Sequence, residues 1–208
     1  MTAPLSGRKA QAALNDQRIL EAARAVFLAD PNAPISAVAE AANVGISALY
    51  RRYASKEDLL HTLATDGLDR YLAEAGRCLA DEGDAWAAFA EFMERCVDAG
   101  TSSLTARLAG SFTPSDALNQ AGRRAGELTY AIIARTIAGG GLRPDILVGD
   151  LSLIFEQLQT VTVGDADRVR QLRRRYLALY LAALRDPDAP PLPGPAPDWA
   201  ELSGRYAR

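Results

Sequence analysis

Hydrophobic positions along the chain recur with the spacing of amphipathic helices. The first clear case begins near Asn15, where apolar residues at intervals of three and four share one helical face. These residues are Ile19, Ala22, Ala23, Val26 and Phe27. No segment shows the strict alternation of a half-buried strand. Nearly half of the residues are apolar but few are aromatic, and alanine, the best helix former, is the common filler. The pattern therefore predicts an all-α protein.

Two short helices are predicted to follow. The segment 30–34 ends the first helix, because its prolines forbid continuation and Asp and Asn favour turns. Apolar spacing resumes over 35–42, and a third helix is predicted over 45–53. Between them stands Asn43, and asparagine is the non-glycine residue best suited to a left-handed reversal. Two short helices joined by a tight turn have the anatomy of a helix-turn-helix.

The third helix divides into an inner and an outer face. Leu49, with Val44 in the turn, is placed to close a small core against the first helix. The opposite face is free, and an α-helix fits the major groove of DNA with its N-terminal residues near base edges. That face carries Ile46, Ser47, Tyr50 and Arg51. Arginine commonly reads guanine and tyrosine hydroxyls suit phosphates, so the face is a candidate DNA-binding surface.

The segments 38–44 and 48–59, VAEAANV and ALYRRYASKEDL, resemble the signature of the tetracycline-repressor (TetR-like) regulators. The opening helix is similar to that of the family as well, so the resemblance covers about 15–63. Three positions depart from the family pattern: Asn43 replaces the turn glycine, Gly45 the Ser/Thr cap and Ala48 a threonine. Asparagine and glycine are tolerated at these positions. Which atoms read the DNA sequence is left open by the lost hydroxyls.

The resemblance implies phosphate contacts by Tyr50 and Lys56. Lys56 also lies in the first turn of a predicted helix that Ser55 caps, where the helix dipole attracts anions. Ser36 is a further phosphate candidate, and Arg51 and Arg52 are candidates for bases or phosphates. The predicted DNA-binding set is Ser36, Gly45, Ile46, Ser47, Tyr50, Arg51, Arg52 and Lys56.

Four regions are predicted along the chain: a flexible N-terminal arm over 1–14, a DNA-binding domain over 15–60, a helical ligand-binding and dimerisation domain over 61–186, and a tail over 187–208. Arg8 and Lys9 lie in the arm. The last 23 residues hold six of the eleven prolines, which predicts an extended tail. Helix starts are expected at 113–116 and at 144–145.

For the larger domain, the resemblance implies a small-molecule cavity and a homodimer formed by the last two long helices. Mostly apolar walls with a few polar groups are typical of such cavities. The candidate lining residues are Trp86, Phe89, Phe92, Met93, Cys96, Leu104, Arg107, Leu108, Phe112, Tyr130 and Ile133. The candidate interface stripes are Leu151, Ile154, Phe155 and Leu158 on one helix and Leu172, Tyr176, Leu179 and Tyr180 on the next. For each residue of both sets, the alternative is that it simply packs in the hydrophobic core of its own chain.

Charge and composition narrow the function. The chain carries a formal charge of −3, and 1–60 holds seven Lys/Arg against six Asp/Glu, so DNA binding must come from a local patch. There is no apolar run long enough for a membrane span and no signal-peptide core. Cys78 and Cys96 form neither a CxxC pair nor a zinc pattern. We therefore expect no metal or cofactor, and the cytosol as compartment.

Two other readings compete with a DNA-binding regulator. An enzyme is disfavoured, because the chain has one histidine, His61, and no GxSxG, HExxH, P-loop or GxGxxG pattern. A helical protein-interaction module without DNA binding is the second rival, with the proline-rich tail as its docking element. The preferred reading is a transcriptional repressor that binds a palindromic operator as a homodimer and is released by a small molecule. A TetR-like activator is the alternative within the same class.

Overall fold

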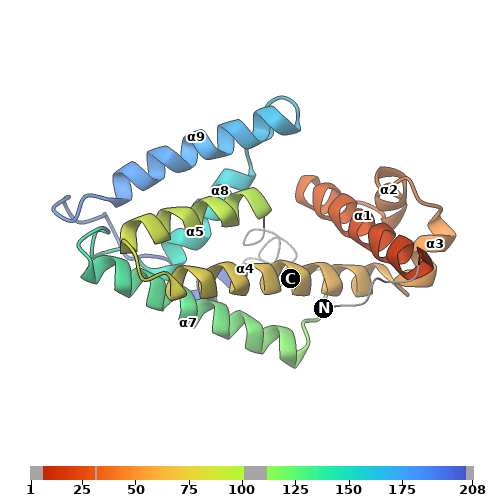
Figure 1. The fold of residues 1–208 in the computed structure, drawn as a ribbon, viewed down its shortest axis with the longest axis horizontal. Helices are drawn as coiled ribbons and strands as arrows, with labels where there is room; N and C mark the ends of the chain where they lie inside the picture. The colour runs from red at the N-terminus through yellow and green to blue at the C-terminus, as the bar shows by residue number, and fades with distance from the viewer. Residues whose placement is uncertain (1–6, 31, 101–111, 205–208) are drawn as a thin grey trace. The chain divides into compact units, whose positions relative to one another are not determined.

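The computed structural model describes residues 7–30, 32–100 and 112–204 (Figure 1). The chain is 72% helical and the described residues form no strand, which confirms the predicted all-α class. The helices are α1 (Gly7–Ala29), α2 (Ile35–Ala41), α3 (Ile46–Arg52), α4 (Lys56–Ala80), α5 (Ala85–Ala99), α7 (Asp116–Ala138), α8 (Val148–Gln159), α9 (Ala166–Leu184) and α10 (Trp199–Gly204). Within the described ranges, none of these helices is long and apolar enough to cross a membrane.

The helices form two compact units. The first contains the chain up to Leu63 together with Phe112 and Thr113. The second begins at Ala64 and holds the remaining helices. Helix α4 contributes its first turns to the first unit and the rest of its length to the second.

In the first unit, α1 packs its apolar face against α2. Ile19, Ala23 and Phe27 are almost fully buried, as the helical spacing predicts. The helix begins at Gly7, so 7–14 are helical and the predicted flexible arm over 1–14 is corrected for these residues, which include Arg8 and Lys9. The physical reason is composition, because alanine, glutamine, lysine, arginine and leucine all favour a helix even where no apolar face continues. Residues 1–6 lie outside the described ranges.

The turn between α2 and α3 has the geometry that its sequence predicts. Asn43 is the one described non-glycine residue with a positive φ, at 52°. Its neighbour Val44 donates a backbone hydrogen bond to the carbonyl of Ala39 at 2.9 Å, which closes the turn onto α2. The predicted Ser55 cap is also confirmed, because its hydroxyl accepts from the backbone N–H of Asp58 at 3.0 Å. The Asp58 carboxylate in turn accepts from the N–H of Ala54 at 3.1 Å.

The second unit is built around α5, which packs against α7, α8 and α9. Phe89, Phe92, Met93 and Cys96 on α5 are almost fully buried, as expected of a helix that neighbours cover on several sides. Helices α4 and α7 run side by side (Figure 1), joined by a hydrogen bond between the hydroxyls of Tyr71 and Thr129 at 2.7 Å. Burial raises the pKa of the Tyr71 phenol, so this hydroxyl stays neutral.

The C-terminal tail has neither helix nor strand over 186–198, although it turns at 187–189, and it lies on the second unit. Arg143, almost buried, donates to the carboxylate of Asp145 at 2.6 Å and to the carbonyl of Pro190 at 2.7 Å. Asp145 also accepts from the N–H of Leu192 at 2.8 Å. Because Asp145 binds the tail in this way, the expected helix start at 144–145 is wrong, and α8 begins at Val148. The short helix α10 was not predicted.

Candidate nucleic-acid interface

Helix α3 separates a buried from an exposed face, and its termini follow the sequence prediction. Leu49 is fully buried and Tyr53, which ends the helix, is 1% exposed. Ile46 is 40% and Tyr50 49% exposed, and Ser47 and Arg51 are exposed as well. Ile46 and Tyr50 are thus large side chains that the described part of the unit leaves partly open to solvent. The outer face of α3 is therefore free to contact DNA, because an α-helix fits into the major groove.

Arg52 belongs to the predicted set but is engaged within the unit. Its Nε donates to Oδ2 of Asp16 on α1 at 2.8 Å, and its guanidinium lies 5.1 Å from the ring centre of Tyr53. The hydrogen bond to Asp16 raises the pKa of Arg52 further, so the group is permanently charged. Half of the side chain is exposed (53%). The ion pair joins the last turn of α3 to α1, and Asp16 is a residue that sequence reasoning missed.

Lys56 is also turned towards its own unit. Its Nζ donates to the carbonyl of Ala33 at 2.8 Å and lies 5.1 Å from the ring centre of Phe27. The side chain is half-buried. These contacts tie the start of α4 to the loop before α2. This hydrogen bond could not be predicted from a sequence motif, because its acceptor is a backbone carbonyl, which every residue has.

The remaining predicted residues lie at helix starts. Ser36 is exposed near the start of α2, whose preceding residue Pro34 gives no side-chain cap. Gly45 precedes α3 with φ −66° and ψ 139°, and no atom lies within 4 Å of a Cβ built there. Its carbonyl accepts from the N–H of Ala48 at 2.8 Å. The three residues 45–47 are all exposed and adjoin Tyr50 and Arg51 on one helix.

The predicted cavity residues are mostly core or lie elsewhere. Phe92 makes edge-to-face contacts with Tyr71 at 5.5 Å and with Phe155 at 6.5 Å between ring centres. Tyr130 is 65% exposed, so its assignment to a cavity wall is corrected: α7 turns this position to solvent. Phe112 belongs to the first unit, where it packs edge-on against His61. Leu104, Arg107 and Leu108 lie outside the described residues.

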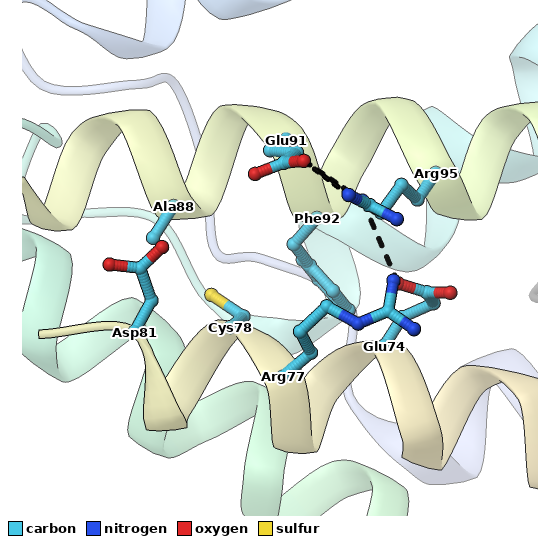
Figure 2. Close-up of a pocket in the computed structure, with 8 residues that line it drawn as sticks. All are labelled: Glu74, Arg77, Cys78, Asp81, Ala88, Glu91, Phe92 and Arg95. Carbon is cyan, nitrogen blue, oxygen red and sulfur yellow. Dashed lines mark hydrogen bonds and ion pairs between the residues drawn. The ribbon is translucent and has the colours of Figure 1, made fainter. Parts of the chain in front are cut away.

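The described part of the second unit has a small cleft between α4 and α5, of about 60 Å³ (Figure 2). Charged side chains from both helices line it, and Arg95 bridges Glu91 on its own helix and Glu74 on α4. Cys78 and Phe92 lie at its floor. Burial raises the pKa of the Cys78 thiol to about 11. The cleft is far below the several hundred Å³ of a typical small-molecule site, so it does not hold a drug-sized effector as it stands.

The two predicted dimer-interface stripes differ in their exposure to solvent. On α8, Leu151, Ile154, Phe155 and Leu158 are all under 9% exposed within the single chain, so this half of the prediction is corrected. Helical periodicity finds an apolar face but does not say which neighbour covers it. On α9, Tyr176 is 47% and Leu179 61% exposed, and Leu172 and Tyr180 are half-buried. Only the α9 stripe is open in this structure.

Comparison with known proteins agrees with this arrangement. Residues 19–63 match the model of the bacterial regulatory proteins of the tetR family. No curated protein matches the chain significantly.

Solved structures share the fold over most of the chain. A TetR transcription regulatory protein from Mycobacterium vanbaalenii is 25% identical, with 85% of this chain and 98% of that one covered and a TM-score of 0.51. LfrR from Mycobacterium smegmatis, solved in complex with proflavine, is 22% identical over 79% of this chain and 95% of that one, at a TM-score of 0.56. CprB from Streptomyces coelicolor A3(2) is 20% identical over 95% and 94% of the two chains, at 0.58.

The helix-turn-helix of the first unit is thus a tetR-type DNA-binding domain, followed by a helical domain of the kind found in these regulators. The family assignment applies to residues 19–63, which match the bacterial regulatory proteins of the tetR family.

Proposed function

We propose that this protein is a transcriptional repressor that binds a DNA operator and is released from it by a small-molecule effector. The observation that carries the proposal is the exposed face of α3, in a helix-turn-helix whose inner residue Leu49 is fully buried. That face presents Ser47, Tyr50 and Arg51 together. Such a helix enters the major groove, where hydroxyls and guanidinium groups contact phosphates and base edges.

We assign the closest contacts to Ser47, Tyr50 and Arg51, with Ile46 and Gly45 against the groove wall. Arg51, unlike Arg52, has no carboxylate partner among the described residues, so it offers its full guanidinium to DNA. Ser36 and Lys56 are assigned to phosphates at the edge of the contact. The Lys56 contact requires its ammonium to keep or exchange the hydrogen bond to Ala33. This division makes Arg51 the sharpest residue to test.

The test of DNA binding compares Arg51→Ala with a matched control, Arg124→Ala. Arg124 is an exposed arginine on α7 that pairs with Glu127. Fluorescence anisotropy with mixed-sequence 30-bp duplexes at low salt should show binding by the wild type and by Arg124→Ala. Arg51→Ala should bind several-fold more weakly, since losing one direct arginine contact to DNA costs about 1 kcal/mol, a factor of about five. Equal affinity of all three proteins would refute the assignment of α3 as the DNA-binding helix.

We further propose that the protein acts as a homodimer through α9. Two recognition helices must lie roughly 34–36 Å apart to enter successive major grooves, which a two-fold dimer provides. The open stripe of Tyr176 and Leu179 on α9 supports this choice of face.

The effector role rests on the family and on one neighbour that was solved with proflavine bound. A ligand that prefers the DNA-free arrangement lowers operator affinity by its differential affinity for the two arrangements. We place the effector in the second unit, from which α4 continues into the DNA-binding unit as one unbroken helix. A repressor whose operator affinity no small molecule changes would contradict this part of the proposal and leave DNA binding intact.

A further inference from the structure

A second cleft lies in the second unit between the end of α5 and the first turns of α9. It has a volume of about 100 Å³ and is lined by Val97, Asp98, Ala166, Val169, Arg170 and Arg173. Three of these side chains are aliphatic and two are arginines. None of the six belongs to the predicted effector cavity or to the α9 stripe.

Arg173 is the unusual member of the cleft. Its Nη2 donates to the backbone carbonyls of Gln159 at 3.1 Å and Val161 at 3.4 Å. Its Nε is buried and has no hydrogen-bond partner. Within the described part of the chain, no carboxylate lies within ion-pair distance of Arg173, whereas Arg170 pairs with Asp167 and Arg174 with Asp98.

A half-buried guanidinium without a counter-charge is costly, since burial removes water without supplying an anion. The cost is visible in the pKa of Arg173, which burial lowers from its ordinary value. A negatively charged ligand in the adjacent cleft would remove this cost. The Asp98 carboxylate on the cleft wall works against an anion, but Arg174 binds it through two nitrogens, which offsets its charge.

We propose that this cleft between α5 and α9 is a binding site for a small monocarboxylate, whose carboxylate meets Arg173 while its alkyl chain contacts Val97, Ala166 and Val169. The volume of the cleft indicates the size of its ligand. A cavity of about 150 Å³ holds benzene, so a cleft of about 100 Å³ holds roughly four or five heavy atoms. Acetate and propionate are of this size. The neighbouring Asp98, together with the alanine and the two valines among the lining residues, favours a singly charged, partly apolar anion over phosphate. This binding does not depend on the proposed DNA-binding function.

The experiment measures thermal unfolding of the full chain in sodium propionate against sodium chloride at equal ionic strength. At about tenfold excess over its Kd, propionate should raise the Tm of the wild type by about 4 °C. In Arg173→Met the rise should vanish, whereas Arg175→Met, which removes an exposed arginine of the same helix, should keep it. Hexanoate, too long for the cleft, should give no rise.

A second variant guards against misfolding of Arg173→Met. Val169→Phe fills the cleft and leaves the Arg173 guanidinium in place, so it should fold and should also lose the propionate effect. Two results overturn the proposal: no propionate-dependent rise in the wild type, or the same rise in Arg173→Met or Val169→Phe. Equal protection by hexanoate or phosphate would overturn the assigned class of ligand.

Discussion

The Arg52 guanidinium at the end of α3 is hydrogen-bonded to the Asp16 carboxylate of α1, with 2.8 Å between Nε and Oδ2. The pair ties the recognition helix to the helix that supports it. It also places a carboxylate beside an arginine that neighbours the proposed DNA-binding face. We therefore expect Asp16 to compete with DNA phosphate for Arg52.

Replacing Asp16 by alanine should strengthen non-specific DNA binding. The pair is partly exposed, so its loss should cost only about 0.5 kcal/mol of stability, while the freed arginine should gain a phosphate contact. We expect several-fold tighter binding to mixed duplexes at low salt and a salt slope steeper by about one. The double variant Asp16→Ala/Arg52→Ala should return the slope to the wild-type value. If Asp16→Ala instead binds DNA more weakly, the ion pair assists DNA binding by orienting α3 more than it opposes DNA binding by neutralising Arg52.

The turn residue Asn43 should tolerate glycine and reject a β-branched side chain. Its φ of 52° is a left-handed conformation, which costs a β-branched residue about 1–2 kcal/mol and glycine nothing. Urea denaturation should show Asn43→Val destabilised by that amount and Asn43→Gly within about 0.5 kcal/mol of the wild type. Equal stability of the two variants would contradict the left-handed turn.

The α9 stripe predicts a single-site dimer disruption. Leu179 is 61% exposed in the chain, so replacing it by glutamate leaves the fold intact but places charge in the proposed interface. Sedimentation velocity at micromolar concentration should show a dimer for the wild type and a monomer for Leu179→Glu. Leu192→Glu, on an exposed leucine of the tail, is the control and should remain dimeric. A dimeric Leu179→Glu would move the interface away from α9.

Both cysteines should be inert in the folded protein at neutral pH. Cys96 is fully buried, and the pKa of Cys78 is raised to about 11 by burial. At pH 8 only about one Cys78 in a thousand is then a thiolate, which is the reactive form. A thiol reagent should label neither residue quickly at pH 8, and both after unfolding in guanidinium. The initial rate should rise about tenfold per pH unit between pH 8 and 10; a rapid phase at pH 7 would contradict the raised pKa.

The helix-turn-helix was predictable because its determinants are local. The apolar spacing around Ile19, the reversal at Asn43 and the Ser55 cap each depend on residues a few positions apart, and the structure has all three. The inner and outer faces of α3 follow from the same periodicity, which placed Leu49 inside and Tyr50 outside.

Features that depend on distant partners could not be predicted in this way. The stripe containing Phe155 is as apolar as an interface, yet its own chain covers it. No sequence motif predicts the pairing of Arg52 with Asp16, which lies 36 positions away. The same holds for the hydrogen bond from Lys56 to a backbone carbonyl. Arg173 is one of several arginines in a basic segment, and only the fold shows that it has no carboxylate partner among the residues described.

The most direct test of the central claim is selection of DNA by the purified protein from a randomised duplex library, followed by sequencing across a salt series. We expect enrichment of a palindrome whose half-sites are centred about one helical turn apart, roughly 10 bp, or a small multiple of it. Arg51→Ala should relax the preference at one position of each half-site. If the dimeric protein enriches no sequence even at low salt, its proposed role as an operator-binding repressor is wrong.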